Sequence, residues 1–228
     1  MCWPQIALLG PPGCRSCGRP LEHDVERCSD CPPVSVTWAR APFLYEGPVR
    51  SALMRLKFGG LRSTAAAIAP WMVWALARSP PAETVDLEAI SVTWVPLGAA
   101  RRRVRGYDQA EALARAVGKL SGRPVGRMLK RVVETTPQAR RPGAARRQAL
   151  RGVFMATRPV PPVILLVDDV LTSGATAASC ARALRRAGAR EVIVLAAARS
   201  LGGRVPARCY NPPVSQPGSV VARERSSR

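Results

Sequence analysis

The chain has 228 residues, of which 47% are hydrophobic and 5% aromatic, and it carries a formal net charge of +20 at pH 7. This length suits one ordinary domain with a small appendage. No apolar run approaches the ~20 residues of a membrane span, and no basic stretch followed by an apolar one opens the chain. We therefore expect a cytoplasmic protein without membrane insertion.

The positive charge comes mostly from arginine and predicts contact with polyanions, either nucleic acid or a substrate that carries several phosphates. Part of the excess is compositional, because the whole chain is rich in Ala, Arg, Gly and Pro. Charge alone therefore does not establish nucleic-acid binding.

The first 35 residues hold two C-x-x-C pairs, Cys14/Cys17 and Cys28/Cys31. Four thiolates at this spacing can close a tetrahedral shell around a structural Zn²⁺ ion, and a segment this short needs such a metal to fold. The alternatives are disulfides, which require export, or a redox pair, which requires a thioredoxin-like setting. We predict a four-cysteine zinc finger over residues 1–35.

Residues 36–89 form a second segment. The mixed sequence around 34–45 indicates one or two strands, Gly47-Pro48 opens a helix, and a second helix is expected over about 63–78.

From residue 90 the pattern alternates between strand and helix, which predicts an α/β fold with a mainly parallel sheet flanked by helices over residues 90–200. Residues 201–228 show no periodicity and are predicted to be a disordered tail. The expected elements are strands at 90–96, 163–167 and 191–197 and helices at 107–121 and 175–187.

The stretch 163–176 is the most informative part of the chain. Its apolar residues predict a strand buried on both faces, which ends in a turn where Asp168 and Asp169 emerge. Small hydroxyl residues and Gly174 follow at a helix N-terminus, whose free amides favour phosphate. Two carboxylates that can hold a diol or Mg²⁺, followed by a phosphate cradle, suit a ribose 5-phosphate ligand. The plainer interpretation is an ordinary buried strand and a capped helix.

These residues resemble the phosphoribosyl diphosphate (PRPP) motif of type I phosphoribosyltransferases. The resemblance implies that Asp168 and Asp169 bind the ribose and serve catalysis, and that the loop binds the 5-phosphate. The PRPP-binding residues that it implies are Val167, Asp168, Asp169, Thr172, Ser173, Gly174, Ala175 and Thr176.

Over roughly residues 10–200 the order of motifs resembles the ComF family, in which a zinc finger is fused to a phosphoribosyltransferase domain. The matching pieces are the cysteine pairs, residues 45–59, 95–97 and 101–110, 129–131 and 136–138, Phe154 and the PRPP motif. The chain departs from the family pattern at Ala145 and Ala149, where a Glu and an Asn are usual.

The family resemblance implies further site residues. Leu97, Gly98 and Arg146 would bind diphosphate, and Arg105 would contact the substrate as a catalytic residue. Lys130, Arg131 and Gln138 are candidates in a mobile loop that closes over the site, and Lys57 in a hood over the pocket. Arg101 to Arg103 can also form a simple solvated face.

The resemblance predicts Mg²⁺-dependent phosphoribosyl transfer from PRPP, or a related phosphorylated sugar, to an unidentified nitrogenous acceptor, and it links the protein to competence and DNA uptake. The alternative is a non-catalytic protein of competence and DNA uptake that binds PRPP or single-stranded DNA, with a competence helicase as a further partner. The low aromatic content weighs against a dedicated nucleic-acid grip. A PRPP-sensing regulator would need a DNA-reading helix, which we do not find. Oligomeric state is not predicted.

Overall fold

The computed structural model describes residues 6–33, 35–58, 63–78, 85–86, 88–133, 150 and 152–201. The predictions for Gln138, Arg146 and the tail from residue 202 onward lie outside these residues.

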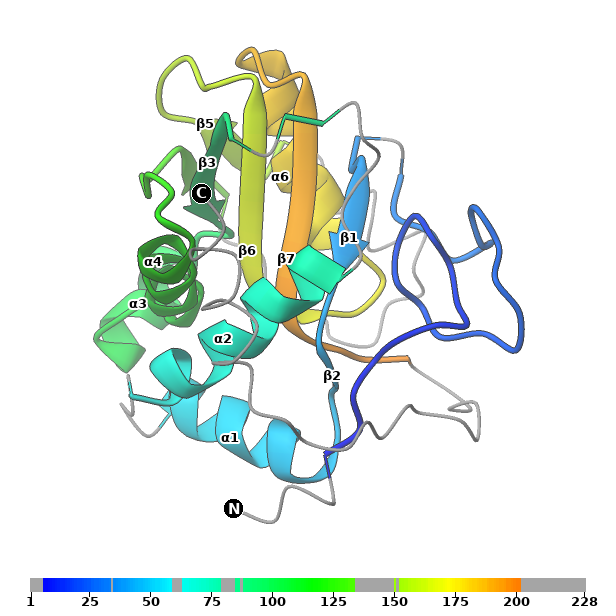
Figure 1. The fold of residues 1–228 in the computed structure, drawn as a ribbon. Helices are drawn as coiled ribbons and strands as arrows, with labels where there is room; N and C mark the ends of the chain where they lie inside the picture. Colours follow the sequence, from blue (N-terminus) through cyan, green and yellow to red (C-terminus); the bar gives the residue numbers. More distant parts are fainter. Residues whose placement is uncertain are drawn as a thin grey trace.

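A five-stranded parallel sheet forms the centre of the molecule (Figure 1). Its path runs β1-β7-β6-β3, and β2 also pairs with β7. This arrangement confirms the predicted α/β fold with a mainly parallel sheet flanked by helices. The strands are β1 (Trp38–Arg40), β2 (Phe43–Leu44), β3 (Ile90–Trp94), β6 (Val163–Leu171) and β7 (Glu191–Arg199).

Helices cover both faces of this sheet, and a second, two-stranded antiparallel sheet of β4 and β5 packs beside α6 (Figure 1). None of the helices in the described ranges is long and apolar enough to cross a membrane. The remaining elements are α1 (Gly47–Phe58), α2 (Ser63–Arg78), α3 (Ala99–Arg105), α4 (Gln109–Ser121), β4 (Leu129–Arg131), β5 (Phe154–Ala156) and α6 (Ala175–Arg186).

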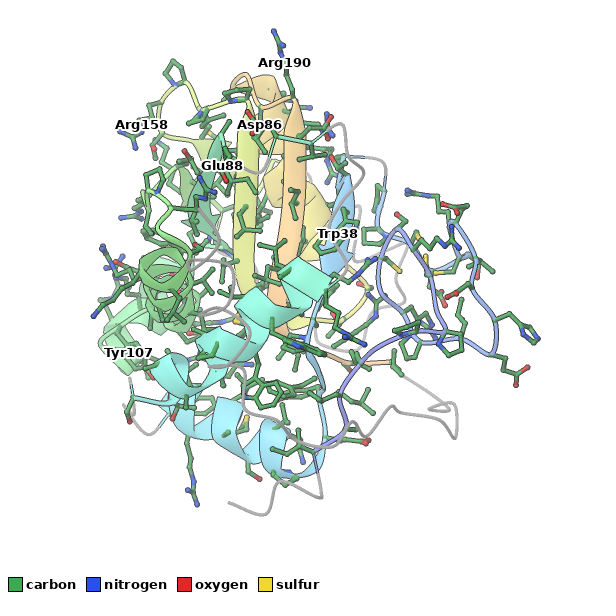
Figure 2. All side chains as sticks on the ribbon, in the orientation of Figure 1. Trp38, Asp86, Glu88, Tyr107, Arg158 and Arg190 are labelled. Carbon is green, nitrogen blue, oxygen red and sulfur yellow. The ribbon has the colours of Figure 1, made fainter. Side chains whose placement is uncertain are left out.

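The sheet carries side chains on both of its faces (Figure 2). From Val163 to Val167 the side chains of β6 alternate between two hydrophobic cores, because successive residues of a strand point to opposite faces of the sheet. Ile164 and Leu166 join the core that contains α6. Leu165 and Val167 join the core that contains α1, α2 and α4. The two acidic residues follow directly on this segment.

Three details differ from the sequence-based expectations. β6 continues to Leu171, so Asp168 and Asp169 lie inside a strand rather than in a turn after it. α4 begins at Gln109, because the Asp108 side chain caps it by accepting hydrogen bonds from the amides of Ala110 and Glu111. The short helix α3 and the two-stranded sheet of β4 and β5 were not predicted.

The N-terminal segment packs against the edge of the sheet as irregular loops beside β1 (Figure 1). The amide of Ala39 in β1 donates to the carbonyl of Ser16 over 3.0 Å. Arg199, buried at the end of β7, donates to the carbonyl of Cys17 over 2.6 Å. These contacts join the cysteine segment to the sheet.

Candidate ligand pocket and cysteine cluster

A pocket of about 320 Å³ lies where β3 and β6 end. Parallel strands place their carboxyl ends at one edge of a sheet, and ligands of open α/β sheets usually bind there. Residues 95–97 after β3 and residues 168–172 around the end of β6 line this pocket. Tyr45 and Lys57 reach it from β2 and α1, and Arg105 and Gln109 from the α3–α4 region.

The two acids of β6 both line the pocket, and their carboxyl groups lie close enough to interact. Asp169 follows the parity of Leu165 and Val167 and therefore faces α1 and α4. Asp168 precedes it in the strand, and its carboxyl group interacts with that of Asp169.

Asp169 is held by side chains from two helices. One carboxylate oxygen, Oδ2, lies 3.0 Å from Lys57 Nζ of α1 and accepts a hydrogen bond from Gln109 Nε2 of α4 over 3.1 Å. Arg105 Nη1 in turn donates to Gln109 Oε1 over 3.0 Å. The acid thus sits at the end of a hydrogen-bonded chain that begins at Arg105.

Asp168 is electrostatically different from its neighbour. Burial raises the pKa of its carboxyl well above its ordinary value, and the adjacent charge of Asp169 raises it further. The amide of Asp169 donates to Asp168 Oδ1 over 2.8 Å and opposes this shift only in part. A divalent cation between the two carboxylates would relieve their repulsion, and oxygen donors of this kind are the ligands that Mg²⁺ prefers. The residues present therefore fit that ion.

The loop after β6, where phosphate binding was predicted, leads directly into α6. Gly174 adopts a φ of 69° and directly precedes α6, whose first amides point out of the helix without partners in it. Thr172, Gly174 and Thr176 line the pocket. Ser173 and Ala175 do not, and the Ser173 hydroxyl is buried with no hydrogen-bond partner among the described residues.

The rest of the lining is strongly cationic. Lys57, Arg101, Arg105 and Arg131 face the pocket against the two aspartates, which suits a ligand with several phosphate charges. Arg101 is therefore part of the pocket and not merely of a solvated face. Lys130, which neighbours Arg131 on β4, does not line it.

One backbone amide of the loop after β3 is already used in a hydrogen bond within the fold. Leu97 lines the pocket, but its amide donates to Asp108 Oδ2 over 2.8 Å. Gly98 and Val167 do not line the pocket. Contacts from the Leu97–Gly98 turn to a diphosphate stay a prediction.

A second cavity, of about 270 Å³, lies between the N-terminal segment and α2. It is lined by Arg15, Arg40 and Arg78 but by one acid only, Asp24. Neither the pair of β6 acids nor the loop before α6 lines it. We therefore assign the candidate site to the pocket at the ends of β3 and β6.

The four predicted cysteine ligands converge. All four sulfur atoms lie within 4.8 Å of one another, with Cys14–Cys31 at 3.4 Å and Cys17–Cys28 at 3.6 Å. Disulfide sulfurs would lie ~2 Å apart. Tetrahedral zinc with bonds of ~2.3 Å separates its sulfurs by roughly 3.8 Å. The cluster is therefore positioned to bind one structural Zn²⁺.

Hydrogen bonds stabilise the thiolate form of at least one of these cysteines. Although burial of Cys14 favours the neutral thiol, backbone amides of Cys17 and Cys28 stabilise the thiolate and lower its pKa to about 7. A thiolate is the form that ligates zinc.

Fold and site together define an α/β protein with a strand-end pocket lined by several cations and two acids, and a four-cysteine module that fits zinc. No family model matches the chain. It is 27% identical over 196 residues to competence protein F of Haemophilus influenzae, a match that covers 83% of this chain and 85% of that protein. It is 29% identical over 192 residues to the DNA utilization protein YhgH of Salmonella typhimurium, covering 82% of this chain and 84% of the relative.

The YhgH protein of Escherichia coli K12 is 27% identical over 192 residues, with the same coverage of 82% and 84%. These similarities confirm the resemblance to the ComF family. Among solved structures, one described as the allosteric regulatory enzyme of purine biosynthesis aligns with a TM-score of 0.38 and 21% identity. That alignment covers 63% of this chain and 30% of the other.

Proposed function

We propose that the pocket binds PRPP with Mg²⁺ and that the protein acts in competence-related DNA uptake as a phosphoribosyltransferase-type protein. The observation that supports this most directly is the composition of one pocket, in which a pair of carboxylates and the loop before α6 meet a cationic wall. A sugar diol suits the acids, a 5-phosphate suits the loop, and a diphosphate suits the arginines and Lys57. The names of the relatives support the association with competence and DNA utilization.

In a transfer reaction the anomeric C–O bond of PRPP breaks and diphosphate leaves with its electron pair. The acceptor nitrogen then forms the new bond to the anomeric carbon and loses a proton. Magnesium, when bound, would supply charge neutralisation of the diphosphate, and Asp168 and Asp169 would hold it beside the ribose. Arg105 and Arg131 would stabilise the developing charge of the leaving group, and the hood from α1 would exclude water.

The first test replaces both acids with asparagine. Asp168→Asn together with Asp169→Asn keeps size and removes two charges, so each lost charge-assisted contact should weaken PRPP binding by ~1.5–3 kcal/mol, roughly tenfold to a hundredfold. Titration calorimetry with Mg²⁺ present measures this loss. Asp30→Asn, at an exposed acid of the cysteine segment, is the control and should bind like the wild type. Equal PRPP affinity in the double variant would refute the proposed role.

The competing function is a single-stranded DNA-binding protein in which the pocket plays no part, and the relatives' names and the +20 charge favour it. Phosphate contacts to DNA release counterions, so such binding should weaken steeply as salt rises, whereas the pocket should retain PRPP far better. We expect single-stranded DNA binding to be weak and largely lost near physiological salt while PRPP binding persists. Tight, salt-resistant DNA binding together with no PRPP binding would favour the competing function.

A further inference from the structure

Lys57 is a nearly buried cation whose carboxylate partner is one of the two acids that the ligand needs. Its side chain is 18% exposed and that of Asp169 is 11% exposed, and their charged atoms lie 3.0 Å apart. The pair joins α1, above the pocket, to β6, its floor. The charges of these two residues therefore compensate each other.

A ribose or its magnesium ion competes with Lys57 for the same oxygen. Asp169 Oδ2 already accepts from Gln109 as well as lying against Lys57, so little of its hydrogen-bonding capacity remains. When a ligand takes this carboxylate, the Lys57 ammonium loses its counter-charge in a setting with little water. Leaving one member of a buried ion pair uncompensated is strongly unfavourable.

Among the described residues that line the pocket, Asp168 is the one other carboxylate, and a magnesium ion held by the two acids would engage it together with Asp169. The neighbours of Lys57 there are the Tyr45 ring, 5.7 Å from Nζ, and the cations of α3 and β4. The missing negative charge must therefore come from the ligand itself.

We propose that Lys57 selects ligands that carry a diphosphate on the anomeric carbon, by exchanging its ion pair with Asp169 for one with that diphosphate. The inference rests on the proposed function and assigns the specificity of the same pocket. PRPP supplies both halves of the exchange, a ribose for Asp169 and an anion for Lys57. Ribose 5-phosphate supplies only the first half and leaves Lys57 uncompensated, so the pocket discriminates against it. Lys57 acts in this exchange as a specificity-determining residue.

Calorimetry of Lys57→Met against PRPP and ribose 5-phosphate, both with Mg²⁺ at fixed ionic strength, tests the exchange. Methionine keeps an unbranched side chain of similar length without the charge. We expect PRPP affinity to fall roughly tenfold or more. We expect ribose 5-phosphate affinity to stay the same or rise, because its binding no longer leaves a buried lysine without a counter-charge. The ratio of PRPP affinity to ribose 5-phosphate affinity should therefore fall by about tenfold or more.

Lys119→Met makes the same substitution at an exposed position of α4 and should leave the preference unchanged. If Lys57→Met does not fold, because Asp169 is left unpaired, Lys57→Met with Asp169→Asn removes both charges and should bind the two ligands with similar affinity. An unchanged preference in the folded Lys57 variant overturns the inference alone. Failure of the wild-type protein to bind PRPP overturns the proposed function and the inference with it.

Discussion

Replacement of Gly174 by alanine should abolish most binding of any 5-phosphorylated ribose. Gly174 has a φ of 69°, a conformation that costs an L-residue about 1–2 kcal/mol. A Cβ atom there would lie 2.8 Å from Cγ and 3.1 Å from Cβ of Pro32, whose ring cannot rotate away. The loop must therefore move, and with it the amides at the start of α6. We expect calorimetry to show PRPP and ribose 5-phosphate each binding at least about tenfold more weakly, the loss of one charge-assisted phosphate contact.

Gly122 offers a matched control because it has the same φ of 69° but nothing within 4 Å of the position of a Cβ. It ends α4, away from the pocket lining. Gly122→Ala should lower the melting temperature by roughly 2–8 °C through the backbone conformation alone, without changing ligand affinity. If both alanine variants bind PRPP like the wild type, the loop before α6 is not the phosphate site.

The sequence of β6 and the loop after it predicted this part of the molecule well, because its signals are local. A buried parallel strand, and a glycine with hydroxyl residues at a helix N-terminus, are each decided within a few residues. The cluster of four cysteines could also be predicted from the sequence, since metal geometry fixes the spacing within each pair. The position of the two acids was less accurate, because pairing with β7 extends β6 to Leu171.

Contacts between distant segments could not be predicted in the same way. The ion pair of Lys57 with Asp169 joins residues from two helix–strand units, and nothing local distinguishes Lys57 from any other helical lysine. The alternation from Val163 to Val167 could have assigned Asp169 to the α1 and α4 face once those helices were placed there. The two-stranded sheet of β4 and β5 was missed because its strands have three residues each and are separated by a long basic stretch without periodicity.

The cysteine module contacts the loop before α6 directly, so its metal should matter to the pocket. Pro32 follows Cys31 and packs on Gly174. Ser35 Oγ donates to the carbonyl of Ala178 in α6 over 3.3 Å, and Arg185 Nε of the same helix donates to the Ser35 carbonyl over 2.9 Å. Zinc that holds Cys31 in place would therefore also hold the wall against which the loop rests.

Loss of zinc should accordingly destabilise the protein and weaken PRPP binding together. Structural zinc contributes about 10–16 kcal/mol to the folding of small zinc modules. Cys17→Ser removes one ligand and also disturbs Arg199, which donates to Cys17 Sγ over 3.5 Å. Metal analysis should give about one zinc per wild-type chain and far less in this variant, and its melting temperature should fall markedly. Calorimetry should show weaker binding of PRPP and of ribose 5-phosphate, because Pro32 no longer supports Gly174.

Cys180→Ser separates this effect from the general cost of changing a buried cysteine. Cys180 is fully buried in α6 and lies outside the four-cysteine cluster. Burial of a new hydroxyl should cost roughly 1–3 kcal/mol while the zinc content stays that of the wild type. Undiminished zinc in Cys17→Ser would exclude the four-cysteine site. Zinc loss without any change in PRPP affinity would instead limit the metal to stabilising its own segment, because the contact between Pro32 and Gly174 would then survive without it.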